Sequence, residues 1–229
     1  MCGRYVAATP ADQLAAFFGA TAPEAPLADN YNVAPTTSVY GVVQQAERSL
    51  ESFRWGLVPS WASDLSVGSR MINARAETVF EKSSFRSLIL QRRLIVPMSG
   101  FYEWRTVPTA GSKPLKLPMY ITRADGSPLA VAGVHTVWRA KDASPDDPWV
   151  HTCSVLTTSA NGTMAPVHDR MPVILEPSQF DTWLDPALTD RSTIERFLVP
   201  AADSVLVMRE VGTAVNSVRN NGSALLDPL

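Results

Sequence analysis

The stretch LAVAGVHTV at residues 129–137 is the part of this chain that most clearly decides its fold class. It is apolar and rich in β-branched residues, so it predicts a buried strand. Similar apolar runs recur at residues 39–43, 94–98, 153–157, 171–175 and 205–211. Helical segments interrupt them without the regular alternation of a doubly wound sheet. The pattern therefore predicts an α+β fold, in which a mixed or antiparallel, curved and barrel-like sheet system is flanked by short helices.

Four helical segments are predicted between these strands. The first starts at Pro10 with Thr9 as its N-cap, and the second covers residues 76–92. The third follows Pro177, and the fourth begins with a capping box at residues 192–195. Residues 20–35 are predicted to form a loop that wraps the surface, and residues 107–117 and 140–148 to form hairpin loops.

Length and composition are those of an ordinary globular protein. The 229 residues are predicted to form a single domain, residues 1–229, with a sizeable core. No apolar run approaches the ~20 residues of a membrane span, so we expect a cytoplasmic protein with no membrane partner. The net charge of −2 argues against a globally basic nucleic-acid-binding protein. Any site for a polyanion would have to be a local patch.

The cysteines and histidines do not predict a metal site. Only Cys2 and Cys153 are present, too few for a disulfide-stapled scaffold, and no pair has the spacing of metal ligands. We therefore expect no metal and no cofactor. Cys153 lies in an apolar run and is interpreted as a buried hydrophobic residue. His135 and His151 lie in or next to predicted strands and are interpreted as structural.

Cys2 is chemically distinctive because it directly follows Met1. Removal of Met1 would leave Cys2 with a free α-amine beside its own thiol. Such a pair condenses with an aldehyde to a Schiff base, and the sulfur then closes a five-membered thiazolidine ring. The unperturbed pKa values are about 7.7–8.0 for the amine and about 8.5 for the thiol, so both are usable near neutral pH. The plainer alternative is a small residue at the start of a buried strand.

Other polar residues lie in apolar surroundings and are candidates for the same site. Asn73 and Arg75 follow an apolar pair, and Glu103 is flanked by aromatic residues. Partial desolvation would suit the Glu103 carboxyl to general acid–base catalysis, whereas the structural alternative is an ion pair with an arginine such as Arg75. His168 lies in a loop-like segment before a strand, and an imidazole with a pKa of ~6.5 can transfer protons at neutral pH.

Aromatic and basic side chains lie close together in the segment RWGLVPSW, residues 54–61. This combination is typical of grooves that bind single-stranded nucleic acid, where stacking contributes roughly 1–3 kcal/mol per base. The alternative is that Trp55 and Trp61 both pack in the core.

Seven short blocks, taken in order, resemble the SRAP family of SOS response-associated peptidases, whose members shield abasic sites in single-stranded DNA. They are CGRY at residues 2–5, YNVAP at 31–35, WGLVPSW at 55–61, NARAET at 73–78, GFYEW at 100–104, HDRMP at 168–172 and VN at 215–216. Because the blocks span nearly the whole chain, the resemblance implies one SRAP domain over residues 1–229.

The resemblance also implies roles for single residues. Cys2 would form a thiazolidine with the ring-opened sugar aldehyde of an abasic site. Asn73 would orient the Cys2 amine or the sugar, Glu103 would move protons during imine formation and ring closure, and His168 would act as an acid on the sugar ring oxygen and in reversal. The remaining matches imply phosphate contacts for Arg4, Arg75 and Arg170 and a lining of the DNA path by Asn32, Trp61 and Thr157.

The implied partner is single-stranded DNA that contains abasic sites, bound by a monomer that associates with the nucleoid when DNA is damaged. Three phosphate-binding arginines would allow an acidic protein to bind DNA at one face. One departure from the family concerns Ala62, which follows Trp61 where some relatives carry a second bulky aromatic residue. The preference for junctions over plain single strands is therefore expected to be weaker.

Three other functions compete with covalent shielding. A cysteine peptidase would use Cys2 as nucleophile, His168 as base and Asn73 or Glu103 to orient it, with self-processing as its main reaction. A lyase would cleave the DNA strand by β-elimination from the Schiff base. A noncatalytic binding module would use only the arginine and tryptophan side chains, so that Cys2→Ala would leave its binding intact.

Overall fold

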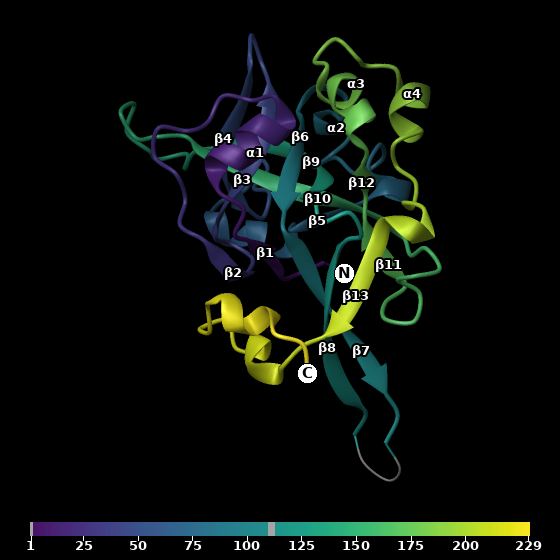
Figure 1. The fold of residues 1–229 in the computed structure, drawn as a ribbon. Helices are drawn as coiled ribbons and strands as arrows, with labels where there is room; N and C mark the ends of the chain where they lie inside the picture. Colours follow the sequence, from purple (N-terminus) through teal and green to yellow (C-terminus); the bar gives the residue numbers. More distant parts are fainter. Residues whose placement is uncertain (1, 110–112) are drawn as a thin grey trace.

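The fold is described from a computed structural model that covers residues 2–109 and 113–229. Its centre is a closed barrel of five strands (Figure 1). Around the barrel the strands follow one another in the order β10 (Val150–Ser159), β4 (Arg48–Trp55), β3 (Ser38–Gln44), β6 (Arg93–Met98) and β9 (Leu129–Trp138). Pairing of β9 with β10 closes the ring. The barrel is mixed, because β10 runs parallel to β4 while the other neighbours are antiparallel.

Three short strands extend this sheet at β9 and β10. β5 (Asn73–Arg75) pairs with β10 in parallel, and β11 (Arg170–Pro172) pairs with it in antiparallel orientation. β12 (Ile174–Leu175) pairs with β9. The apolar run at residues 171–175 therefore gives two strands, which are separated at Val173. The other predicted apolar runs all coincide with strands.

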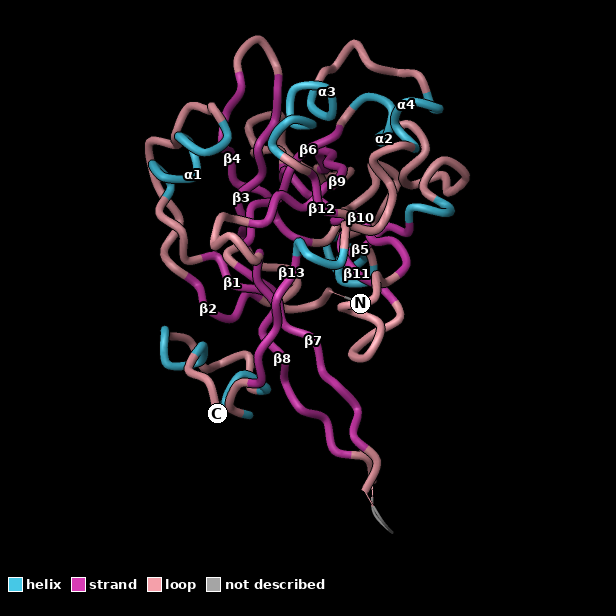
Figure 2. Tube along the Cα trace, turned by 45° about the vertical axis from the view of Figure 1, so that its right-hand side comes forward, coloured by secondary structure: helices cyan, strands magenta, loops and turns pink. Residues whose placement is uncertain are grey.

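A second sheet lies beside the barrel and carries the N-terminal strand. Its order is β13 (Leu206–Glu210), β8 (Leu115–Arg123), β7 (Gly100–Val107), β1 (Tyr5–Ala7) and β2 (Asn30–Val33). The β7–β8 hairpin extends away from the barrel, next to the C-terminal segment (Figures 1 and 2). The predicted hairpin loop at residues 107–117 is shorter than expected, and residues 110–112 within it lie outside the described residues, as does Met1. The predicted surface loop at residues 20–35 ends in β2.

Four short α-helices and six 3₁₀ turns cover the sheets. The helices are α1 (Ala11–Phe18), α2 (Leu88–Gln91), α3 (Phe180–Leu184) and α4 (Arg191–Glu195). The 3₁₀ turns are η1 (Leu65–Arg70), η2 (Ala76–Thr78), η3 (Pro177–Gln179), η4 (Asp203–Val205), η5 (Thr213–Asn216) and η6 (Ser223–Leu226). These counts refer to residues 2–109 and 113–229.

Alternation along the barrel strands divides the core in two. In β6, Ile95 packs with the helices, in a cluster that includes Phe18 of α1 and Trp183 of α3. Its neighbours Leu94 and Val96 belong to a second cluster, to which no residue of α1–α4 contributes. Because successive side chains of a strand point to opposite faces, the barrel-strand members of the second cluster point into the closed barrel. The cluster continues into the second sheet through residues such as Tyr5, Phe101 and Ile121.

Three predictions about helices were wrong in detail. Residues 76–92 form only η2, a series of turns and α2, because β-branched and serine residues in this segment lower its helix propensity. Thr9 does not cap α1, since its hydroxyl is 2.9 Å from the Ser99 hydroxyl and Pro10 occupies the N-cap. The fourth helix is capped by Asp190, whose carboxylate accepts from the backbone N–H of Thr193 at 2.7 Å. The predicted third helix is confirmed.

Candidate active site

Cys2 lies within the inner core and not at a solvent-exposed end. Its side chain is 1% exposed and packs among residues such as Tyr5 and Trp55. Burial, and next the negative charge of Glu103, raise the pKa of the thiol well above its ordinary value, while a hydrogen bond from the Arg4 backbone N–H lowers it. The thiol is therefore protonated at neutral pH. The plainer expectation was right about burial, but Cys2 precedes β1 and lies beside polar side chains.

Asn73 holds the backbone of Cys2 in place. Its side-chain amide nitrogen donates to the Cys2 carbonyl oxygen at 3.0 Å. β5 positions this side chain by its parallel pairing with β10, where Asn73 lies opposite Val155. The Asn73 Oδ1 atom is buried and accepts no hydrogen bond within the described part of the chain. It therefore has a lone pair that a donor arriving in the site could use.

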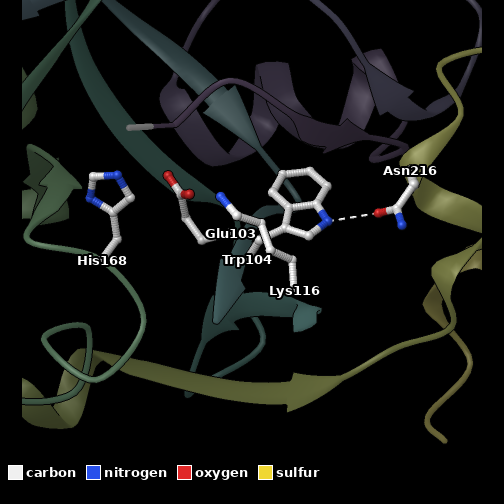
Figure 3. Close-up of a pocket in the computed structure, with 5 residues that line it drawn as sticks. All are labelled: Glu103, Trp104, Lys116, His168 and Asn216. Atoms are coloured by element: carbon white, nitrogen blue, oxygen red, sulfur yellow. Dashed lines mark hydrogen bonds between the residues drawn. The ribbon is translucent and has the colours of Figure 1, made fainter. Parts of the chain in front are cut away.

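Glu103 connects Cys2 to a cavity at the base of the β7–β8 hairpin. The residue lies on β7 opposite Met119 of β8 and is 5% exposed. The cavity, which we call the Glu103 pocket, has a volume of about 410 Å³ and is lined by Glu103, Trp104, Lys116, His168 and Asn216. Figure 3 shows His168 next to Glu103 at one end and Asn216 at the other, with Trp104 and Lys116 between them.

His168 reaches the pocket from the loop that precedes β11. Its Nδ1 atom lies 3.0 Å from the backbone N–H of Arg170, which donates to it, and 2.7 Å from a carboxylate oxygen of Asp169. The neutral ring with its proton on Nε2 accepts from Arg170, whereas a ring protonated at Nδ1 donates to Asp169. Both protonation states of His168 thus have a partner without movement of the ring, which suits a residue that takes up and releases a proton.

Asn32 is buried and Arg4 is half-buried against the C-terminal segment. The Arg4 guanidinium donates to the Asn32 side-chain oxygen and, at 2.7 Å, to the carbonyl oxygen of Val215. The Asn32 side-chain amide donates to the carbonyl oxygens of Val215, Ser217 and Asn220 at 3.3, 3.0 and 3.0 Å. Burial lowers the pKa of Arg4. Both side chains therefore anchor residues 215–220, which form one side of the Glu103 pocket through Asn216.

Arg170 and Thr157, both expected to contact DNA, lie together. The Arg170 guanidinium forms its hydrogen bonds within the protein, to Thr157 and Glu77. The Arg170 guanidinium donates to both Glu77 carboxylate oxygens at 2.5 and 2.9 Å and to the Thr157 carbonyl oxygen at 2.7 Å. These hydrogen bonds from Arg170 lower the pKa of Glu77. Thr157 is fully buried on β10. Of these three residues, Glu77 has the most exposed side chain.

Arg75 and Trp61 are the two predicted DNA-contact residues that the fold leaves exposed. Arg75 ends β5 and has no hydrogen bond or ion pair within residues 2–109 and 113–229, so the expected alternative of a Glu103–Arg75 pair is wrong. Trp61 is 61% exposed and does not line the Glu103 pocket. Trp55 is fully buried and donates from its indole nitrogen to Ile72 at 3.0 Å. Core packing was therefore the right interpretation for Trp55 and the wrong one for Trp61.

Three pocket residues had no predicted role. Trp104 and Asn216 lie within the motif blocks at residues 100–104 and 215–216, and the Trp104 indole donates to the Asn216 side-chain oxygen at 2.7 Å. Lys116 falls in the segment predicted as a loop and instead belongs to β8. The sequence does not show the strand register that brings Lys116 to the pocket. The position of Lys116 near the end of a predicted hairpin was the only sign that it could lie at a site.

The described parts of the chain, residues 2–109 and 113–229, hold no group of three or more Cys, His, Asp or Glu side chains arranged to bind a metal ion. None of the helices among them has the length and apolar character needed to cross a membrane.

Comparison with known proteins decides the family. Residues 1–218 match the family model for SOS response associated peptidase (SRAP). The chain belongs to the SRAP family. This SRAP chain is 35% identical over 230 residues to the abasic site processing protein YoqW of Bacillus subtilis (strain 168), with 99% of each chain covered. It is 34% identical over 230 residues to the abasic site processing protein YoaM of the same organism, covering 99% of this chain and 98% of the relative.

The fold is shared with a solved structure as well. A protein from Bacteroides thetaiotaomicron, determined by X-ray crystallography, matches the SRAP chain with a TM-score of 0.85 at 26% identity, with 100% of both chains covered. The predicted α+β architecture with a curved, barrel-like mixed sheet is thereby confirmed as the SRAP fold, and so is the family that the seven motif blocks indicated.

Proposed function

We propose that this SRAP chain processes abasic sites in single-stranded DNA by capturing their ring-opened aldehyde as a thiazolidine on Cys2. The observation that carries the proposal is the convergence of Asn73 and Glu103 on Cys2, with His168 next to Glu103 in an open pocket. The names of the relatives YoqW and YoaM, both abasic site processing proteins, support the choice of substrate.

The first step would form an imine. Once Met1 is removed, the α-amine of Cys2 adds to the aldehyde carbon, the carbinolamine oxygen takes up a proton, and water leaves. The unpartnered Oδ1 atom of Asn73 is suited to accept a hydrogen bond from this amine and so to aim its lone pair at the aldehyde. His168 would donate the proton that opens the sugar ring, for which its two alternative Nδ1 contacts are suited.

The second step would close the ring. The Cys2 sulfur adds to the imine carbon, the C=N electron pair returns to nitrogen, and the thiol proton must leave. Glu103 lies close enough to raise the pKa of this thiol by its charge, so its carboxylate is the suitable acceptor for that proton. While the thiol loses its proton, negative charge develops on sulfur beside the Glu103 carboxylate. The positive charge of the iminium would offset the repulsion between these two groups. Aldehyde and aminothiol thus give thiazolidine and water, with no oxidation or reduction.

The state of the Cys2 thiol favours this reaction over peptidase chemistry. A cysteine peptidase attacks with a thiolate whose pKa is lowered by a neighbouring imidazolium or helix N-terminus. Burial and the Glu103 charge instead raise the pKa of Cys2. A thiol that adds to an iminium needs no preformed thiolate, because proton transfer can accompany the addition. Closing the thiazolidine also consumes the Schiff base from which a lyase would eliminate.

The decisive experiment is an intact-mass and denaturing-gel assay with single-stranded DNA that bears one abasic site. We expect the purified protein to lack Met1 and to give a DNA adduct that survives denaturation without borohydride. Cys2→Ala should give no such adduct yet still bind the DNA in a salt-sensitive manner. Cys2→Ser retains the amine but not the sulfur, so an adduct from this variant should require borohydride. Absence of any adduct from the processed wild-type protein would refute the proposal.

A further inference from the structure

Beyond Glu103, on the side away from His168, the Glu103 pocket offers hydrogen-bond donors. Lys116 lies next to Glu103, between it and Trp104 (Figure 3), and its ammonium group can only donate. An indole N–H can also only donate, so the 2.7 Å contact from Trp104 requires the Asn216 oxygen to face the indole. The Asn216 NH₂ group is therefore directed away from Trp104. It donates to no acceptor within residues 2–109 and 113–229.

These side chains are held by separate parts of the fold. Lys116 lies on β8 opposite Thr106, two residue pairs along the hairpin from the pair formed by Trp104 and Pro118. Lys116 and Trp104 are thus diagonal neighbours on the hairpin, which explains why both line one cavity. Asn216 comes from η5 in the C-terminal segment.

The position of Asn216 is fixed from two sides. Its own oxygen accepts from the Trp104 indole, and the carbonyl oxygen of the preceding Val215 accepts from the Arg4 and Asn32 side chains. The buried polar contacts of Arg4 and Asn32 therefore determine where Asn216 presents its NH₂ group. This gives a structural reason for the half-buried Arg4 and the buried Asn32 beside a pocket that they do not line.

We propose that Lys116 and Asn216 form a subsite for a phosphodiester group next to the abasic sugar, with the Trp104 indole between them as the surface on which the sugar lies. The inference rests on the proposed function, because that function supplies a DNA strand whose sugar is attached at Cys2. A phosphodiester carries one negative charge and only acceptor oxygens, which complements an ammonium and an amide donor. Glu103 and His168, where the aldehyde would react, lie on the side of Lys116 that faces away from Asn216 (Figure 3).

The test separates the phosphate contact from covalent chemistry. Single-stranded oligonucleotides carry one tetrahydrofuran residue, an abasic analogue without an aldehyde, and either normal phosphodiesters or a neutral methylphosphonate on its 5′ or 3′ side. Equilibrium binding is measured by fluorescence anisotropy. On normal DNA, Lys116→Ala should weaken binding about tenfold, as expected for a lost charge-assisted hydrogen bond. On the oligonucleotide with the methylphosphonate at the contacted position, wild type and Lys116→Ala should bind equally.

Two further variants sharpen the result. Lys113→Ala removes the same charge from the same hairpin outside the pocket, and it should leave affinity within about twofold of wild type. Asn216→Asp keeps an oxygen acceptor for the Trp104 indole but replaces the NH₂ donor by an anionic oxygen, so it should weaken binding to normal DNA more than to the methylphosphonate. Circular dichroism and denaturant unfolding establish that each variant is folded.

The subsite is refuted if Lys116→Ala binds normal DNA as wild type does, or if it weakens binding equally with and without either methylphosphonate. These outcomes are distinct from failure of the proposed function, in which wild type gives no adduct with aldehyde-bearing DNA. The tetrahydrofuran analogue cannot form that adduct with any variant, so the binding comparison stands whatever Cys2 does.

Discussion

The side-chain amide of Asn73 donates a 3.0 Å hydrogen bond to the backbone carbonyl oxygen of Cys2 and thereby ties β5 to the segment that precedes β1. This contact matters because the reactive groups of Cys2 would otherwise sit at the end of a chain, where backbone freedom is greatest. The same side chain keeps its Oδ1 atom buried and without a hydrogen bond in the described part of the chain. One residue thus both fixes Cys2 and offers an acceptor beside it.

Asn73→Asp should separate these two roles. It retains an acceptor oxygen but loses the donor to the Cys2 carbonyl, so Cys2 would be less well positioned. We expect the rate of adduct formation to fall about tenfold and the free energy of unfolding to fall by about 1 kcal/mol. Single-turnover crosslinking and urea unfolding measure the two quantities. A normal rate in this variant would show that the contact does not orient Cys2 for reaction.

Glu103→Gln preserves the shape of the side chain but removes the carboxylate that we propose as the proton acceptor. Adduct formation and its reversal should both slow by at least about tenfold, because each direction moves the thiol proton. The pKa of the Cys2 thiol should fall at the same time, since the negative charge that helps to raise it is gone. A pH series of thiol alkylation with a small reagent measures that change. Unaltered rates in both directions would remove Glu103 from the mechanism.

Trp61 and Trp55 form a matched pair, with one indole exposed and one buried. Trp61→Ala should weaken binding to single-stranded DNA about tenfold and leave stability nearly unchanged, because the 61% exposed ring packs little against the protein. Trp55→Ala should destabilise the fold by about 3–5 kcal/mol, since it empties a fully buried site and removes the indole bond to Ile72. DNA titration and urea unfolding of both variants test the contrast.

His135 predicts an acid-sensitive fold. Burial, and next the charges of Arg92 and His151, lower the pKa of His135 to about 4. The unfolded chain binds a proton at this residue from about pH 6.5 downward, whereas the native state does so only near pH 4. Stability present above pH 6.5 is therefore lost as the pH falls through this window, at up to about 1.4 kcal/mol per pH unit.

His135→Phe removes the titrating group and retains a ring next to Phe53, whose centroid lies 5.3 Å from the His135 ring. Urea unfolding at several pH values between 4 and 7 should give a flatter dependence of the unfolding free energy on pH than in wild type. Parallel curves for the two proteins would mean that other groups cause the loss at acidic pH.

Six strand regions could be predicted because they contain apolar, β-branched runs, as at residues 129–137. Strands with more polar residues or few residues were harder to recognise. β4 reads RSLESFRW, in which only Leu50, Phe53 and Trp55 are buried, and β5 has just three residues. Ring closure depends on the pairing of β9 with β10, a tertiary contact that local propensity does not encode.

The candidate site was predicted best where chemistry marks a residue and least where geometry does. Cys2, Asn73, Glu103 and His168 were all singled out, and the fold brings Asn73 and Glu103 to Cys2 and His168 to Glu103. The burial of the Cys2 thiol was expected only under the plainer alternative, a small residue at the start of a buried strand, and the sequence did not show which side chains would surround it. Lys116 was missed because strand register decides where a hairpin lysine points.

Arg75 provides the most direct test of electrostatic DNA binding, because it is exposed and has no hydrogen bond or ion pair in the described residues, 2–109 and 113–229. Arg75→Ala should weaken binding to any single strand, abasic or not, and should lower the slope of log K against log salt by about 0.7, the value for one phosphate contact on single-stranded DNA. Arg196→Ala is the matched control, since Arg196 is also exposed but belongs to the end of α4.

Arg170→Ala should behave differently, because it also releases Glu77 from a bidentate pair and so adds a repulsive charge near the DNA. Titrations at several salt concentrations distinguish these cases, and an Arg75→Ala slope equal to wild type would mean that Arg75 contacts no phosphate.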